Sequence, residues 1–255
     1  MEDKLNTPAI VGKYHPGIYD RLNSFRTARL LLARNRQHIH HLGDVFLRHG
    51  LHERFGLGLL HKRFDLFGDE HLVRTFELRH GVAYKTPTPR RMYAVPCMWR
   101  AQRGPRGQWL FYPLEFASYS EVAERRADEF ETQRLFLFEI AQYLEGLGVL
   151  DVFGIATTGI LALPCRESEI LVEVAEMHRR LLTVQAEPRM GTSHDALTET
   201  FWTFHRDGRP TEFGPAVQCR TVASVAGETI NAASHPISSM PQVRPIVAAV
   251  AMESM

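Results

Sequence analysis

The sequence predicts an α+β fold in which an antiparallel sheet of several strands packs against an N-terminal helical segment and one long central helix. Apolar residues recur at helical spacing over residues 19–50, and a second helical pattern covers residues 118–146. Residues 57–116 instead alternate between apolar and polar side chains, as strands do. The strands come in runs and do not alternate with helices, which favours α+β over a parallel βαβ sheet.

The N-terminal helical segment is defined by its apolar spacing. Intervals of three and four, or sums of these, separate the residues Leu22, Phe25, Leu32, Ile39, Leu42, Val45 and Phe46. Gly50 follows the last of them, and glycine commonly ends a helix. We therefore expect helical structure from residue 19 to residue 50.

Four strands are predicted between residues 57 and 116. In LGLLHKRFDL, the apolar Leu60, Phe64 and Leu66 alternate with polar residues, FGDE supplies a turn, and HLVRTFELRH supplies the returning strand of a hairpin. RMYAVPCMW and QWLFYPLEF, joined by the loop RGPRG, supply two more. Together these segments predict a four-stranded antiparallel meander.

One long helix and further strands are predicted after the meander. Ser118 and Glu121 form a capping-box pattern at the start of the helix, and Gly146 and Gly148 end it. The segments VLDVFGIATTGILALP and AVQCRTVASV are interpreted as strands. In SEILVEVAEMHRRLLTV the Val and Ile content favours a strand and the Glu spacing favours a helix, and we expect the strand. The Asp-Gly pair in TFWTFHRDGRPTEF indicates a hairpin.

The sequence predicts a single domain. No internal repeat or low-complexity block is evident. We expect one α+β domain over residues 1–233 and a proline-dotted, poorly ordered tail over residues 234–255.

The composition excludes several classes of protein. The chain has 30 basic and 29 acidic residues, and this balance argues against a protein whose main partner is nucleic acid. Its three cysteines lie far apart, which favours a reducing compartment over a disulfide framework. No secretion signal and no apolar run long enough to span a membrane is present. We therefore expect a soluble cytoplasmic protein with no membrane or nucleic-acid partner.

Histidine is the outlier of the composition. Eight of the 13 histidines fall between residues 38 and 80, and their protonation near pH 6 would make this stretch strongly cationic. On the predicted helix, His49 borders the apolar face. On the predicted strand, His61, Arg63 and Asp65 project from the same face.

These residues form a polar functional site in one interpretation. His61 and Asp65, supported by His49 and His52, would bind Fe(II) or Zn(II), because imidazoles and a carboxylate with open positions suit those ions. Arg63 would hold an anionic substrate group by bidentate hydrogen bonds. In a metal-free version, His61 is a general base that Asp65 orients. In the opposing interpretation these side chains only cap, hydrogen-bond or decorate a surface, and no recognised ligand motif such as HExxH is present to decide.

Glu115 is a further candidate. It lies at the end of the aromatic run YPLEF, where a raised pKa would make its carboxylate a general base. The alternative that we favour is a strand-end carboxylate that caps the following helix.

The segment LLHKRFDL, followed by the predicted hairpin, resembles uncharacterised proteins from fungal genomes that share an LLHKxFDL-type hairpin. Those proteins often have a second histidine where this chain has Arg63. The resemblance implies no function that can be carried over.

We therefore predict a small-molecule enzyme with a histidine-rich polar pocket between the helical segment and the first hairpin. The preferred version is a metal-dependent oxygenase or hydrolase/lyase that acts on a small anionic substrate. The alternative is a non-catalytic binding or regulatory protein whose histidine face responds to pH.

Overall fold

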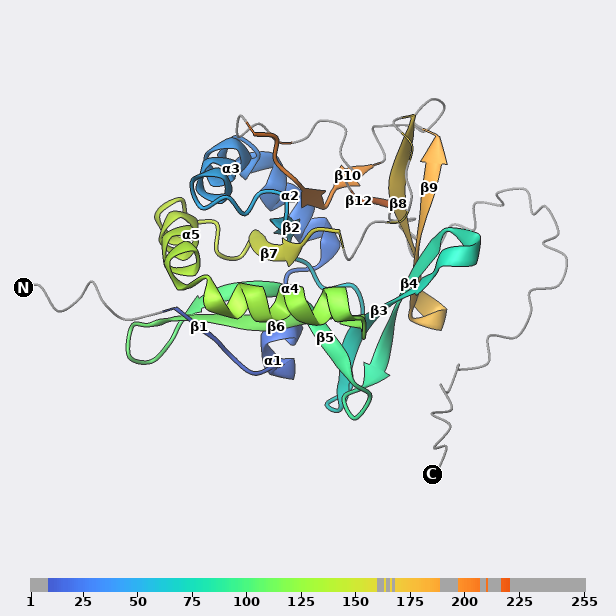
Figure 1. Cartoon of the computed structure of the whole chain (residues 1–255). Helices are drawn as coiled ribbons and strands as arrows, with labels where there is room; N and C mark the ends of the chain where they lie inside the picture. Colours follow the sequence, from blue (N-terminus) through green and yellow to red (C-terminus); the bar gives the residue numbers. More distant parts are fainter. Residues whose placement is uncertain are drawn as a thin grey trace, which may run out of the picture. The chain divides into compact units, whose positions relative to one another are not determined.

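The computed structural model describes residues 9–159, 163, 166, 168–188, 197–206, 210 and 217–220, although not the side chains of Leu78 and of residues 217–220. All of them belong to one compact unit, Met1–Val222. The predicted C-terminal tail, residues 234–255, lies outside the described residues. Within them, helices and a mixed sheet form an α+β fold, as the sequence predicts (Figure 1).

The N-terminal helical segment is three helices and not one. The helices of the described part of the chain are α1 (Pro16–Asp20), α2 (Phe25–Asn35), α3 (His38–Arg48), α4 (Glu121–Thr132) and α5 (Arg134–Gly146). Ser24 starts α2, because its hydroxyl accepts a hydrogen bond from the Thr27 N–H (3.3 Å). Gly50 follows the end of α3 with a φ of 64°, so the predicted terminating residue is confirmed.

The central helix is broken into α4 and α5, so the prediction of one long helix is wrong. Gln133 separates the two, and its ψ of 49° is not helical. The break lets α4 pack on the sheet while α5 packs on α3. The first of the two helices is capped by Ser120, whose hydroxyl accepts from the Ala123 N–H (3.1 Å), and not by Ser118.

The strands form one mixed sheet that curls around an interior. They are β1 (Ile10–Val11), β2 (Phe55–Leu59), β3 (Glu70–Glu77), β4 (Val82–Pro89), β5 (Ala94–Arg103), β6 (Trp109–Ser118), β7 (Phe153–Thr157), β8 (Glu169–Glu176), β9 (Leu181–Pro188), β10 (Thr198–Glu199), β11 (Phe201–Trp202) and β12 (Val217–Arg220). Their order is β10-β12-β8-β9-β4-β3-β6-β5-β7-β2-β11, with β1 added beside β6. The two edge strands of this order, β10 and β11, are neighbours in the sequence, because only Thr200 separates them.

The predicted four-stranded meander is only partly present. The β3–β4 and β5–β6 pairs are antiparallel, but β3 and β6 are parallel neighbours. The first strand, β2, pairs with β7 and β11 and not with β3, so the first predicted hairpin is wrong. This strand ends at Leu59 and is buried along its whole length. A strand that is covered on both faces is apolar along its length and does not alternate between apolar and polar residues, which is the pattern on which the prediction depended.

The later strands are largely as predicted. The segments that contain β7 and β12 were expected to be strands, and each forms one over part of its length. Residues 168–184, expected to form a single strand, instead form β8 and the first half of β9, separated by the 3₁₀ helix Met177–Arg179. The Asp-Gly turn of the predicted C-terminal hairpin lies outside the described residues, although Phe204 and Pro210 on its two sides form an antiparallel bridge.

The order helix, helix, strand, strand, 3₁₀ helix, strand occurs twice in the described part of the chain. The first copy is α2, α3, β2, β3, Leu78–His80 and β4; the second is α4, α5, β7, β8, Met177–Arg179 and β9. Corresponding strands have equal lengths of 5, 8 and 8 residues. Gly50 and Gly148 end the second helix of each copy with φ values of 64° and 69°. The expectation that the chain holds no internal repeat is therefore wrong.

The strands that follow each copy repeat as well. β5 follows the first copy and pairs antiparallel with β7 of the second. β11 follows the second copy and pairs antiparallel with β2 of the first. A Cβ on Gly154 would lie 2.5 Å from the carbonyl oxygen of Trp99 in β5, and a Cβ on Gly56 would lie 2.4 Å from that of Trp202 in β11. The same close backbone approach therefore requires glycine at the same place in both copies.

A pseudo-twofold axis relates the two copies. Leu57 and Ile155, which occupy the same position in β2 and β7, are direct partners in the antiparallel pairing of those strands. Tyr84 and Thr183 are likewise equivalent and paired in β4 and β9. Two equivalent residues can face each other in this way only where the axis passes between them.

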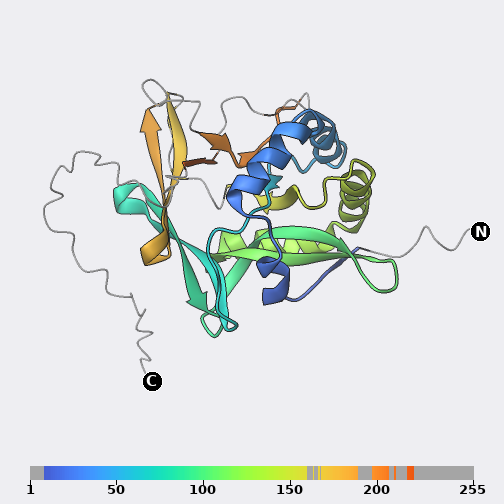
Figure 2. The ribbon, with the colours of Figure 1, turned by 180° about the vertical axis from the view of Figure 1, so that it is seen from behind.

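Two apolar clusters hold the fold together. The larger lies between helices α2–α5 and the outer face of the sheet and is centred on Phe46, Phe130 and Phe136. The smaller lies on the inner side of the curled sheet and includes Leu72 and Leu171. Strands β8 and β9 stand at the end of the sheet away from α3 and α5, beside the β3–β4 hairpin (Figure 2). The inner side is where the polar site described next is found.

Candidate functional site

A small cavity lies inside the curled sheet, close to the pseudo-twofold axis. Its lining consists of Gly58, Arg63, Arg74, Lys85, Cys97, Met98, Glu115, Ala156, Glu173, Thr200 and Phe201. It offers about 20 Å³ to the centre of a water molecule, so at least one water-sized group fits.

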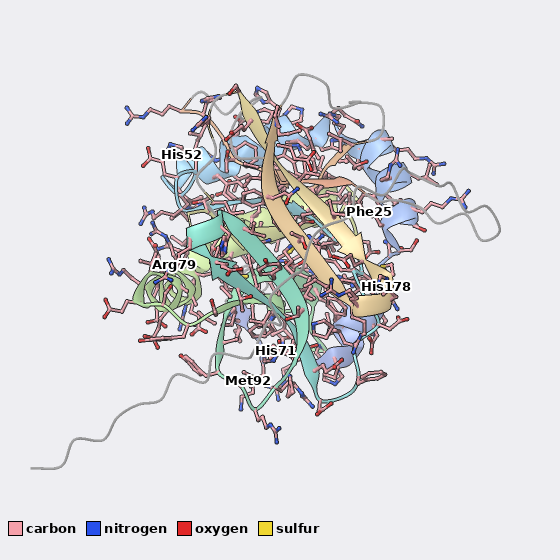
Figure 3. All side chains as sticks on the ribbon, turned by 90° about the vertical axis from the view of Figure 1, so that its right-hand side faces the viewer. Phe25, His52, His71, Arg79, Met92 and His178 are labelled. Carbon is pink, nitrogen blue, oxygen red and sulfur yellow. The ribbon has the colours of Figure 1, made fainter. Side chains whose placement is uncertain are left out.

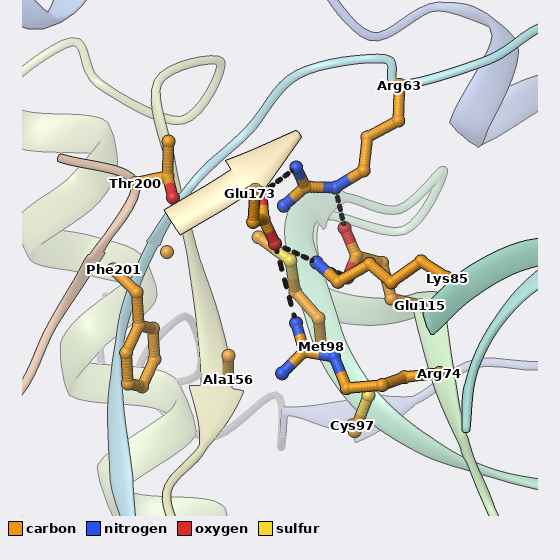
Figure 4. Close-up of a pocket in the computed structure, with 11 residues that line it drawn as sticks. Arg63, Arg74, Lys85, Cys97, Met98, Glu115, Ala156, Glu173, Thr200 and Phe201 are labelled. Atoms are coloured by element: carbon orange, nitrogen blue, oxygen red, sulfur yellow. Dashed lines mark hydrogen bonds and ion pairs between the residues drawn. The ribbon is translucent and has the colours of Figure 1, made fainter. Parts of the chain in front are cut away.

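Most of the lining comes from equivalent positions of the two copies. Gly58 corresponds to Ala156, and Met98 corresponds to Phe201, because each pair occupies matched registers in the strands described above. These four are the apolar part of the lining, and Figure 4 shows Ala156 and Phe201 across from the charged side chains.

The charged side comes from alternating positions of the inner strands. Arg74 in β3 lies two residues from Leu72, and Glu173 in β8 two residues from Leu171, so each charged side chain shares the inner face of its strand with a buried leucine. Arg74 and Glu173 are themselves equivalent in the two copies. At this position the first copy therefore has a cation, Arg74, and the second has an anion, Glu173, whereas two identical copies would have like charges.

Three cations and two carboxylates make up the charged cluster (Figure 4). The Lys85 Nζ lies 2.9 Å from Glu115 Oε2 and 2.8 Å from Glu173 Oε1. The Arg63 Nε donates to Glu115 Oε1 at 2.8 Å, and its Nη1 donates to Glu173. All five side chains, counting Arg74, are at least nine-tenths buried.

Both carboxylates are held ionised. Burial alone would raise the pKa of Glu173, but Arg63, Lys85 and Arg74 outweigh it and lower that pKa to about 2. The same three cations overcome the burial of Glu115 and hold its pKa well below the usual range. The predicted raised pKa at Glu115, and the predicted role as a cap at the end of its strand, are therefore wrong. The residue lies within β6 and belongs to the buried cluster.

Arg74 is the least satisfied member of the cluster. Its side chain is 4% exposed, and its buried Nε has no hydrogen-bond partner in the described part of the chain. Its Nη2 lies 3.7 Å from Glu173 Oε1, beyond hydrogen-bond distance. In the register of β3 and β4 it stands directly opposite Lys85. Like charges in directly opposed positions repel each other, and the two carboxylates offset only part of this repulsion.

Of the residues predicted from the sequence, Arg63 and Glu115 line the cavity. The Arg63 guanidinium contacts both carboxylates of the cluster. His61 is buried in the apolar surroundings of Phe25, with ring centroids 5.0 Å apart, and its Nδ1–H donates to the Leu59 carbonyl oxygen (3.0 Å). Burial, reinforced by Arg63, lowers the pKa of His61 to about 3, so this imidazole is neutral at physiological pH.

The other predicted ligands lie in separate settings. Asp65 is exposed and pairs with Lys62 at 2.7 Å, so it does not share a face with the buried His61. The His49 Nε2 lies 2.7 Å from a carboxylate oxygen of Glu139 in α5. Neither ring nitrogen of His52 has a hydrogen-bond partner among the described residues. Figure 3 shows His52 well apart from His71, another member of the histidine-rich stretch.

The structure does not bring the predicted metal ligands together. Within the described part of the chain, the group of three whose ligand atoms lie within 4.8 Å of one another is His40, His41 and Asp44, on the exposed side of α3. The expectation that the whole histidine-rich stretch becomes cationic near pH 6 is also wrong for two members. Burial lowers the pKa of His61 and of His71.

Sequence reasoning missed Arg74, Lys85 and Glu173. One available signal is the position of each in an otherwise apolar inner face, such as Glu173 in EILVEV. Another is the rarity of lysine, since the chain has only Lys4, Lys13, Lys62 and Lys85. The strand pairing that assembles the three side chains has no such local signal.

In the described residues no helix has the length and apolar character needed to cross a bilayer. No protein-family model, curated protein or solved structure matches this chain.

Proposed function

We propose that the protein binds a small organic anion, a carboxylate in the simplest case, in the cavity inside the curled sheet, as the first step of small-molecule chemistry there. The observation that carries the proposal is the buried guanidinium of Arg74. The Arg74 side chain lines the cavity, and its buried Nε has no hydrogen-bond partner among the described residues. A buried donor without a partner costs about 1–3 kcal/mol, and more when the group is charged.

The charge of the cluster supports an anionic ligand. Among the described residues, the cavity contains three cations and two carboxylates. Cys97 adds no negative charge, because burial raises the pKa of its thiol to about 12. A monoanion would balance the buried charge, and a carboxylate matches the fork of a guanidinium.

The opposite wall indicates the rest of the ligand. Gly58, Met98, Ala156 and Phe201 present apolar surface to the charged groups. Only a small group fits between the two walls. A short carboxylate with a small apolar end satisfies both sides, whereas a highly hydrated anion such as sulfate would leave the apolar wall against its oxygens.

Thermal unfolding in the presence of anions tests the proposal. Acetate, propionate, pyruvate and sulfate would be compared with chloride at matched ionic strength, in the parent, in Arg74→Met and in the exposed control Arg179→Met. A ligand at one hundred times its Kd stabilises the folded state by about 2.7 kcal/mol. We expect a short carboxylate to raise the Tm of the parent and of Arg179→Met but not of Arg74→Met.

Two results would overturn the proposal. One is that no organic anion raises the Tm of the parent above the chloride control. The other is that the rise is the same in Arg74→Met, which would place the binding site elsewhere.

A further inference from the structure

Lys85 is unusual among the lysines of this chain. Lys13 is exposed, and the side chain of Lys62 is 30% exposed and bound to a surface aspartate, whereas that of Lys85 is 1% exposed. Lys4 lies outside the described residues. Lysine is among the residues least often buried, so a fully buried lysine on a cavity wall invites a chemical explanation.

An arginine would serve better than a lysine if the position only joined two carboxylates. A guanidinium binds carboxylates with two parallel hydrogen bonds, and this chain uses arginine for the neighbouring positions 63 and 74. What lysine alone offers is an amine that can lose its proton. Burial, together with Arg63 and Arg74, lowers the pKa of Lys85, so the neutral amine becomes more accessible.

We propose that Lys85 is a reacting amine that forms an imine with the carbonyl carbon of a small 2-oxo acid whose carboxylate is bound by Arg74. The inference rests on the proposed function, because Arg74 has first to bind the carboxylate. Arg74 and Lys85 are direct partners in neighbouring strands, so their side chains reach the same cavity from adjacent positions. A 2-oxo acid carries its carbonyl carbon next to its carboxylate and can therefore contact both side chains at once.

The chemistry balances with groups that the cavity contains. The lone pair of the neutral Lys85 amine attacks the carbonyl carbon, and the carbonyl oxygen gains a proton to give a carbinolamine. Loss of that oxygen as water leaves the carbon–nitrogen double bond of the imine. The neutral amine supplies both protons of the departing water, one to the carbonyl oxygen in the carbinolamine and one when that oxygen leaves, while Glu115 and Glu173, 2.9 and 2.8 Å from the nitrogen, hold it in place.

The other nucleophile in the cavity is unsuited to this role. Cys97 also lines the cavity, but its thiol is protonated at neutral pH because burial raises its pKa to about 12. A thiol in that state is a poor nucleophile. Lys85 is thus the nitrogen nucleophile of this wall, and two carboxylates hold its amine at hydrogen-bond distance.

Reductive trapping tests the inference. The full chain would be incubated with pyruvate and sodium cyanoborohydride, which reduces an imine to a stable secondary amine, and the modified residue identified by peptide mass mapping. With four lysines in the chain, the map separates Lys85 from every other site. We expect modification of Lys85 in the parent and in the control Lys62→Arg, and at least tenfold slower modification of Lys85 in Arg74→Met.

The map of the parent decides the outcome, so the test does not depend on whether a variant of Lys85 folds. Modification confined to the N-terminus and the exposed lysines would overturn the inference. If short carboxylates still raise the Tm in an Arg74-dependent manner, that result leaves the proposed function standing and removes only the imine. Modification of Lys85 at an unchanged rate in Arg74→Met would overturn the assigned binding mode.

Discussion

Glu173→Gln should be far more destabilising than Arg74→Met, although both remove one charge from the same buried cluster. Glu173 contacts Lys85 at 2.8 Å and also contacts Arg63. Its replacement leaves three buried cations facing the single carboxylate of Glu115, and turns an amide N–H₂ toward donors. Arg74→Met instead leaves two cations facing two carboxylates and removes an Nε that had no hydrogen-bond partner.

The magnitude follows from the pKa of Glu173. A fall from the usual 4.5 to about 2 corresponds to about 3 kcal/mol of stability, because each pKa unit is worth about 1.36 kcal/mol. Breaking a buried ion pair by removing one partner costs a similar amount, about 3–5 kcal/mol. We therefore expect about 3–5 kcal/mol for Glu173→Gln and about 1 kcal/mol or less for Arg74→Met.

Urea unfolding followed by circular dichroism measures both changes. Thermal unfolding gives an independent measure. In a chain of this length each kcal/mol of lost stability lowers the Tm by roughly 2–4 °C, so Glu173→Gln should lower the Tm by about 10 °C. The sign of the pH dependence is a second check. The ionised Glu173 stabilises the folded state above pH 4.5, and this contribution is lost as the pH falls through about 2. A loss of stability in Arg74→Met that equals or exceeds that in Glu173→Gln would refute this account of the cluster.

Three further predictions concern single positions. The pKa of His61 is about 3 in the folded state and near 6.5 in the unfolded state, so the free energy of unfolding of the parent should fall by about 2 kcal/mol between pH 6.5 and pH 5. In urea unfolding at a series of pH values, His61→Asn should abolish this loss, whereas the exposed control His40→Asn should retain it. Gly148→Ala should cost about 1 kcal/mol because φ is 69°, whereas Gly146→Ala, with open space around its Cβ, should not destabilise; equal Tm values would contradict the assigned helix end. Gly154→Ala should cost about 1–3 kcal/mol or more, since its Cβ would lie 2.5 Å from a backbone oxygen, and a neutral result in thermal unfolding would disprove the close strand contact.

The local structure of this protein is readable from its sequence wherever a local signal exists. Gly50 as a helix end and the strand character of the β7 and β8 segments follow from spacing, turn chemistry and β-branched content, whereas the turn between β8 and β9 was not predicted. The single helix over residues 118–146 does not, because the apolar pattern continues across Gln133 and only packing of the two halves on different partners explains the break.

The tertiary structure alone decided the repeat and the candidate site. The two copies share strand lengths, glycine positions and four of the eight residues of β3 (EHLVRTFE) and β8 (EILVEVAE), but these matches are too short and too far apart in the chain to be noticed as a repeat before the strands are aligned. His61 and Arg63 are two residues apart, yet the His61 ring packs beside Phe25 while the Arg63 guanidinium joins the two carboxylates of the charged cluster, because the predicted strand ends at Leu59. The sequence by itself determined a mixed helical and sheet fold and drew attention to Arg63. Arg74, Lys85 and Glu173 meet through pairing between strands that are distant in the chain, and composition and local spacing carry no information about such pairing.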